Sequence, residues 1–266
     1  MSADPAAPTD ELVFEIAADG IARITLNRPQ ARNALTFGMY EGLIELCGRI
    51  ERDDSVRALI VTGAGDKAFA AGTDIAQFRA FTTADDALGY ERFMDRVMDT
   101  LERLRVPTIA AVAGACTGGG AAIAAVCDMR LATRDARFGF PIARTLGNCL
   151  SLATLKRLCA LIGAGRVRDI LLTARLVGAQ EASAIGLVNE VVEDAAALAE
   201  RAQALASQLA GHAPLTLHAT KEGLRRLAQE AEPEGDDLIL QCYLSEDFRE
   251  GMEAFLGKRP PRWRGR

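Results

Sequence analysis

The sequence predicts an α/β protein whose C-terminal third is helical. Two observations carry this prediction. Apolar, β-branched runs alternate with helical patterns over about the first 150 residues, which is typical of a parallel or spiral arrangement of strands and helices. Beyond Leu150 helical patterns dominate. The 266 residues suffice for one large α/β domain with a helical appendage. We expect a flexible N-terminus (1–10), an α/β core (11–200) and a C-terminal helical region (201–266).

The elements of the first half follow from local signals. Two strands are expected around the Asp19–Gly20 turn. Thr36 is a suitable N-cap for the first helix, and Pro107 ends the second. The predicted strands are 12–16, 21–26, 56–62, 108–113 and 128–132, and the predicted helices are 36–52, 84–103 and 119–126.

The second half is expected to hold six helices and one strand. Several of these helices are rich in alanine and apolar over wide faces, which suits packing on the core or on other subunits. The predicted helices are 152–161, 165–173, 179–184, 195–209, 214–228 and 236–255, with a strand at 187–192.

Composition excludes several classes of protein. A net charge of −5 argues against general nucleic-acid binding. The N-terminus lacks the pattern of a signal peptide, and no apolar run approaches the roughly 20 residues of a membrane span. The six cysteines form no CxxC pair and no metal-ligand spacing. These features indicate a cytoplasmic protein with free thiols, no metal and no membrane partner.

Two glycine-rich turns, each following a strand-like run, are the strongest functional signal. The first spans residues 63–75 and the second 114–122. Glycine allows backbone N–H groups to approach a ligand that a Cβ would keep away. Two such turns facing each other aim two N–H groups at one oxygen, which is an oxyanion hole. Neither turn has the GxxxxGK[ST] or GxGxxG spacing of a nucleotide site.

The second turn also permits a different interpretation. Residues 114–118 read G-x-C-x-G between a strand and a helix, like a nucleophile elbow with Cys116 in place of serine. A Cys–His hydrolase would need His212 or His218, with Asp194 before them in the chain. Both histidines lie in alanine- and leucine-rich helical stretches, and nothing in the sequence orients either toward Cys116.

Several segments spread over residues 12–266 point to one family. KAFAAGTDI (67–75) and AVAGACTGGGAAIAAVCD (111–128) resemble the two signatures of the enoyl-CoA hydratase/isomerase (crotonase) superfamily. LNRPQARNAL (26–35) is similar to its CoA-binding loop, and ARFGFPI (136–142), AQEASAIGLVNEV (179–191) and the C-terminus resemble later segments. The resemblance implies a crotonase-like spiral of ββα units with a helical C-terminal trimerisation region, and a homotrimer or a hexamer built as a dimer of trimers.

The resemblance also implies roles for individual residues. The backbone N–H groups of Thr73 and Gly119 would bind the thioester oxygen, helped by the dipole of the helix that Gly119 opens. Coenzyme A would enter as part of an acyl-CoA substrate, with no separate cofactor. Its adenine and phosphate end would be held by residues Arg28, Ala31, Ala71, Asp74, Ile75 and Lys258.

The chain departs from the family at two positions. The two glutamates that hold the catalytic water in the hydratases of this family are replaced by Ala122 and Ile142. Positioned acid–base groups typically supply ~10²–10⁴-fold in rate, so efficient standard hydration is not expected. Three outcomes stay open: other polar groups near the turns take over, Arg144 docks the carboxylate of a decarboxylated acyl-CoA, or the protein binds acyl-CoA without turnover.

Overall fold

The computed structural model describes residues 10–80, 82–229, 245–247, 250, 251, 254, 257 and 259–266. Two sheets form the framework of these residues. The larger sheet has the order β1-β2-β3-β5-β7-β10, and the smaller one β4-β6-β8-β9. The strands of the larger sheet are β1 (Leu12–Ile16), β2 (Ile21–Leu26), β3 (Ala58–Gly63), β5 (Thr108–Val112), β7 (Met129–Thr133) and β10 (Glu190–Val192). Those of the smaller sheet are β4 (Ala68–Ala70), β6 (Ala115–Thr117), β8 (Arg137–Gly139) and β9 (Val177–Gly178).

The chain winds as a spiral that adds one strand to each sheet per turn. β3 is followed by β4, β5 by β6, and β7 by β8, and these strands are parallel to their neighbours within each sheet. Among the described strands, the antiparallel pairs are β1 with β2 and β8 with β9. The repetition of ββα turns confirms the predicted spiral.

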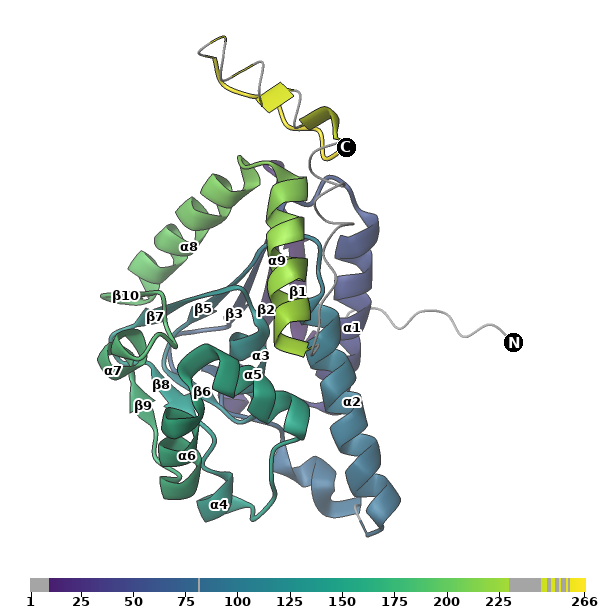
Figure 1. The fold of residues 1–266 in the computed structure, drawn as a ribbon. Coiled ribbons are helices and arrows are strands. Elements are labelled where there is room, and N and C mark those ends of the chain that lie inside the picture. Colours follow the sequence, from purple (N-terminus) through teal and green to yellow (C-terminus); the bar gives the residue numbers. More distant parts are fainter. Residues whose placement is uncertain are drawn as a thin grey trace.

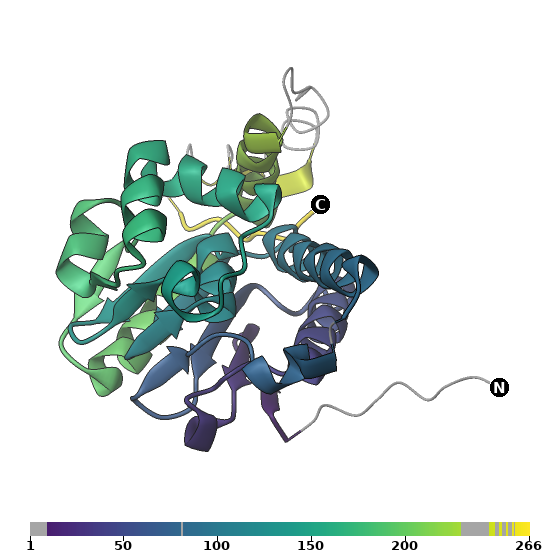
Figure 2. The ribbon, with the colours of Figure 1, turned by 90° about the horizontal axis from the view of Figure 1, so that it is seen from below.

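Helices cover the larger sheet on both faces. They are α1 (Phe37–Arg52), α2 (Ala84–Glu102), α3 (Gly119–Val126), α4 (Ile142–Thr145), α5 (Leu152–Ile162), α6 (Ala164–Thr173), α7 (Ala179–Ala184), α8 (Ala195–Ala210) and α9 (Pro214–Gln229). The helices α1 and α2 lie side by side along one flank, and α8 crosses the sheet away from them (Figure 1 and Figure 2).

The two faces of the central strands serve two separate parts of the core. In β3, Leu59 and Val61 pack with α1, α2 and α3, whereas Ala58 and Ile60 pack against α8. This alternation follows from the two-residue period of a strand, and a strand buried on both faces has an apolar residue at every position. The predicted boundary at residue 200 falls inside α8, which buries Leu198 and Ala202 against the same sheet.

Most predicted elements are confirmed, but the smaller sheet is not among them. The predictions for β1, β2, α3 and α7 match the observed bounds, and Thr36 caps α1 by accepting a hydrogen bond from the Met39 N–H at 3.1 Å. All four strands of the smaller sheet were missing from the prediction, as was α4. The predicted helix at 236–255 lies largely outside the described residues. No helix in the described part of the chain has the length and apolarity to cross a membrane.

Candidate active site

The two glycine-rich turns meet at one cavity of about 230 Å³. The first turn contributes residues 71–73 and 75 to its lining, and the second contributes residues 117–119 and 122. The two turns face each other because β4 and β6, the short strands within these two segments, are parallel neighbours in the smaller sheet. Parallel strands bring the loops at their carboxyl ends to the same edge of a sheet.

Hydrogen bonds to Leu35 hold the first turn in place. The Leu35 N–H donates to the Gly72 carbonyl, and the Asp74 N–H donates to the Leu35 carbonyl, both at 2.8 Å. These two bonds form a parallel β-bridge in which Thr73 lies opposite Leu35. In such a bridge the N–H of Thr73 is directed away from Leu35. Among the described residues the Thr73 N–H has no hydrogen-bond partner, and it is therefore available to a ligand in the cavity.

Gly119, the first residue of α3, carries the second N–H that is expected to face a ligand. The N–H groups in the first turn of a helix have no partner within the helix and carry the positive end of its dipole. The preceding residue, Gly118, has φ of 53°, a left-handed conformation that favours glycine. A Cβ at position 119 would lie 2.0 Å from the Tyr40 hydroxyl oxygen, so glycine is required there for steric reasons as well.

A chain of hydroxyl groups supports the first turn. The Thr73 hydroxyl lies 2.8 Å from the Tyr40 hydroxyl and 3.1 Å from the Tyr90 hydroxyl. Tyr40 is fully buried, and burial raises the pKa of both tyrosines above the usual value. Both therefore stay protonated at neutral pH, and their hydroxyl groups hold the Thr73 side chain.

The two positions at which the family's glutamates are replaced belong to this cavity. Ala122 on α3 and Ile142 on α4 both line the cavity with Thr73 and Gly119. Arg144 does not: it is exposed on α4 and is not among the lining residues. Its predicted role in docking a carboxylate is therefore not supported, because the four-residue helix α4 turns Ile142 and Thr145, rather than Arg144, toward the cavity.

The residues expected to hold coenzyme A gather around the first turn. Ala71 and Ile75 line the cavity, and the Ala71 N–H donates to the Arg32 carbonyl at 3.0 Å, next to Ala31. Arg28 donates to Asp74 at 3.2 Å and pairs with Glu11 at 3.0 Å. The guanidinium of Arg28 is thus neutralised by two carboxylates and organises the loop. Lys258 lies outside the described residues.

The sequence interpretation missed the whole contribution of α2 to the cavity, and above all Glu91. Its side chain comes from α2, and it is the only charged side chain among the described residues that line the cavity. A signal for it exists in the sequence, since Glu91, Met94 and Met98 have the i, i+3, i+7 spacing of one helix face, and both methionines line the cavity as well.

The structure argues against Cys116 as a nucleophile. The side chain is fully buried on β6, and burial raises the pKa of its thiol, which keeps it protonated. His212 and His218 line a different cleft, together with Arg57 and Arg105, and the Asp194 side chain accepts a hydrogen bond from the Ala197 N–H as the N-cap of α8. No Cys–His pair forms, because β6 points Cys116 into the core.

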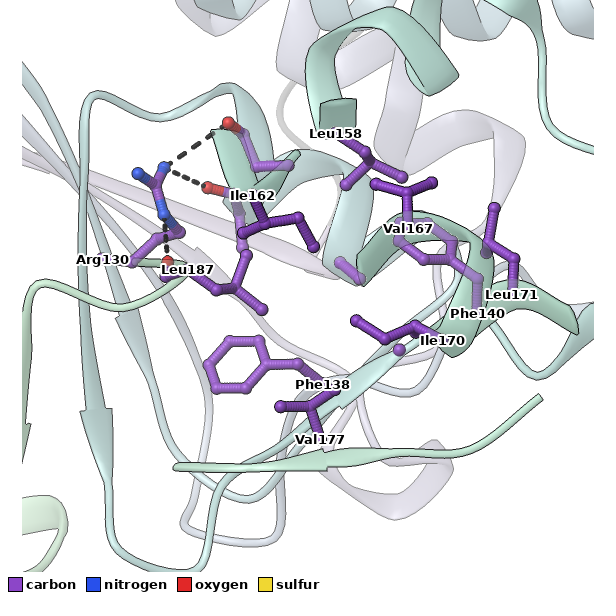
Figure 3. A pocket seen from close by; sticks show the side chains of 14 residues that line it. Arg130, Phe138, Phe140, Leu158, Ile162, Val167, Ile170, Leu171, Val177 and Leu187 are labelled. Carbon is purple, nitrogen blue, oxygen red and sulfur yellow. Dashed lines mark hydrogen bonds between the residues drawn. The ribbon is translucent and has the colours of Figure 1, made fainter. Parts of the chain in front are cut away.

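A second cavity is lined by α3 and by apolar side chains of α5 and α6, among them Leu158, Ile162 and Val167 (Figure 3). It is apolar and measures about 30 Å³, which leaves no room for a substrate. Arg130 is its one charged lining residue, and the guanidinium donates to the carbonyl oxygens of Leu187 at 2.7 Å, Cys127 at 2.5 Å and Ala124 at 3.1 Å. Through these bonds Arg130 caps the carbonyl groups at the C-terminal end of α3. The cavity itself belongs to the hydrophobic core.

The fold and the facing turns define a crotonase-type α/β spiral, and comparison with known proteins identifies its family. A model of the enoyl-CoA hydratase/isomerase family matches residues 17–266. The short-chain-enoyl-CoA hydratase of Clostridium acetobutylicum is 37% identical over 90% of this chain and 92% of its own, and the crotonyl-CoA hydratase of Syntrophomonas wolfei is 35% identical over the same shares.

Solved structures agree with this assignment. The crystal structure of an enoyl-CoA hydratase/carnithine racemase from Magnetospirillum magneticum superposes with a TM-score of 0.89, at 36% identity and with 97% of each chain covered. The chain belongs to the enoyl-CoA hydratase/isomerase family.

Proposed function

We propose that the protein binds an acyl-CoA thioester and stabilises the enolate that forms when the α-carbon becomes carbanionic. The observation that carries the proposal is the pair of unused backbone N–H groups, on Thr73 and Gly119, at one cavity. Negative charge on the thioester oxygen is the charge that such a pair stabilises best. Among the described residues, the cavity lining contains no cationic side chain that would do so instead.

Coenzyme A enters this proposal as part of the substrate, and enolate stabilisation needs no other cofactor. Its nucleotide end would rest on the loop around Ala31, Ala71 and Ile75. Arg28 would shape this loop through its ion pair with Asp74 rather than bind a phosphate by itself. The family's assembly supports a homotrimer or a dimer of trimers, which light scattering of the purified protein measures directly.

Efficient hydration of a simple enoyl-CoA is not part of the proposal. Alanine and isoleucine at positions 122 and 142 neither activate a water molecule nor donate a proton. The relatives named above are hydratases by name, so crotonyl-CoA is the substrate that discriminates. A turnover typical of efficient hydratases would contradict this half of the proposal.

The deciding experiment is a panel of CoA thioesters, followed by mass spectrometry in D₂O. The panel includes saturated, 2-enoyl, 3-enoyl and malonyl-type thioesters. We expect α-carbon deuteration or isomerised product for at least one of them. Binding of thioesters without deuteration or product would identify the protein as a non-catalytic binder. Decarboxylation of the malonyl-type thioester alone would identify a decarboxylase. A residue other than Arg144 would then have to bind the carboxylate, because Arg144 does not line the cavity.

A further inference from the structure

Helix α2 brings one carboxylate to a site that lacks both family glutamates. Glu91, Met94 and Met98 share one face of α2 and form a wall of the cavity. Thr73 and Gly119 line the same cavity, as do Ala122 and Ile142. An acid–base group is therefore present, but it approaches from a helix instead of from the two positions where the family carries it.

The Glu91 carboxylate has no partner of its own. Among the described residues it accepts no hydrogen bond and forms no ion pair, although it is only partly exposed. Asp95, one helical turn further, is in contrast held by the Ser151 hydroxyl at 2.7 Å. Burial, and then the negative charge of Asp95, raise the pKa of Glu91. A partly desolvated, unpaired carboxylate is costly for the fold and is typical of a group kept for proton transfer.

The other polar groups of the cavity are poorer candidates. Tyr90 is tied to the Thr73 hydroxyl and stays protonated. Thr117, Thr145, Asn148, Ser151 and Thr154 do not ionise near neutral pH, and Cys149 is an exposed thiol rather than a carboxylate. Glu91 is thus the one carboxylate of the described cavity lining that can accept a proton and give it back.

We propose that Glu91 is the catalytic residue that moves the proton of the bound thioester, a role that rests on the proposed enolate chemistry. A Glu91 carboxylate oxygen takes a proton from the α-carbon. The electron pair of the broken C–H bond enters the enolate, whose charge rests on the thioester oxygen between the Thr73 and Gly119 N–H groups. With a 3-enoyl thioester, the protonated Glu91 then returns the proton to the γ-carbon and the double bond moves to the 2,3 position.

This step is balanced without a second group. No water is added, no electron is exchanged with another molecule, and Glu91 ends as it began. A single carboxylate therefore suffices for a 1,3-proton shift. Water addition, by contrast, uses a pair of positioned carboxyl groups in the hydratases of the family.

The test uses but-3-enoyl-CoA with the full-length protein in D₂O. Formation of crotonyl-CoA and deuteration of the α-carbon are followed for the wild type, Glu91→Gln and Glu91→Asp. Asp85→Asn on the exposed first turn of α2 is the matched control, because it removes a carboxylate from the same helix outside the cavity. Binding of a saturated acyl-CoA and thermal unfolding are measured for each variant.

We expect Glu91→Gln to lose about 10²-fold or more of both rates, in line with the contribution of a positioned base, while it still folds and binds acyl-CoA. Asp85→Asn is expected to match the wild type. Wild-type rates retained in a folded Glu91→Gln variant would overturn the role of Glu91 and leave the proposed enolate chemistry standing. A wild type that binds thioesters but neither isomerises nor deuterates them would overturn both.

Discussion

Replacing Gly119 by alanine tests the oxyanion hole at its most constrained point. A Cβ at this position would lie 2.0 Å from the Tyr40 hydroxyl oxygen, 3.2 Å from the Thr73 hydroxyl and 3.3 Å from a methyl group of Leu35. Ordinary contact begins at 3.4 Å, so the tyrosine contact alone requires a shift of about 1.4 Å (3.4 minus 2.0). Tyr40 is fully buried, so its ring cannot shift without displacing packed neighbours.

The shift has two costs of known size. Overpacking of a close-packed site destabilises by about 1–3 kcal/mol. Because the backbone of Gly119 carries one of the two proposed donors, displacement also weakens the hole, and loss of one oxyanion donor lowers kcat by about 10²–10³-fold. We therefore expect Gly119→Ala to lose both stability and enolate formation, while Gly89→Ala, in a position with open space inside α2, loses neither.

A double-mutant cycle assigns the cost to its cause. Tyr40→Phe removes the clashing oxygen, together with a hydrogen bond to Thr73 worth about 1 kcal/mol. Urea unfolding of the two single variants and the double variant gives the coupling energy. If the tyrosine oxygen causes the clash, the double variant is more stable than the sum of the single effects by about 0.5–3 kcal/mol. Additive effects would refute the steric reasoning.

Three further predictions concern buried groups. Arg130→Met removes the donor to five carbonyl oxygens, those of Leu187, Ala124, Ala125, Cys127 and Asp128, and is expected to cost about 3 kcal/mol or more in urea unfolding. The matched Arg134→Met, which breaks only an exposed ion pair, should cost about 1 kcal/mol or less. In native protein, iodoacetamide is expected to label exposed Cys149 and not Cys116; rapid labelling of Cys116 would revive the hydrolase hypothesis. Finally, the pKa of Glu91 is raised in the folded state, so the folded state holds this proton more tightly than the unfolded state. The contribution of Glu91 to stability therefore falls as pH rises from the usual glutamate pKa to the raised one. Glu91→Gln should thus be more stable than the wild type at pH 7, with an advantage that disappears below about pH 4, under the usual glutamate pKa; a Glu91→Gln variant less stable at pH 7 would contradict this.

The elements that the sequence predicted are those with long, regular patterns. The apolar run of β3 is continuous and α1 combines a capping residue with a helical apolar pattern, and both elements were found. The smaller sheet was missed because its strands are two or three residues long. Such a strand is too short to show a two-residue alternation, and it forms because the neighbouring turn of the spiral offers an open edge. That cause is tertiary and leaves no local pattern.

The site divides in the same way. Thr73 and Gly119 were found because glycine-rich turns mark backbone chemistry directly in the sequence. Glu91 was missed because it lies in a charged stretch of α2 between Tyr90 and Arg92, where a glutamate is ordinarily a solvated surface residue. Only the way α2 packs shows that its Glu91 face meets the two turns. The spacing from Glu91 to the apolar Met94 and Met98 was the one available hint.

The placement of the carboxylate has a consequence for the reaction. Two glutamates at positions 122 and 142 can hold one water molecule between them, whereas Ala122 and Ile142 leave that part of the cavity apolar. An apolar wall favours a hydrocarbon chain over water, and it also strengthens the N–H groups of the hole by lowering the local dielectric constant. A single base on α2 in such a cavity suits proton movement along the acyl chain better than addition of water. Under the proposed function, the missing glutamates and Glu91 are two sides of one change of chemistry, from hydration toward proton transfer on the enolate.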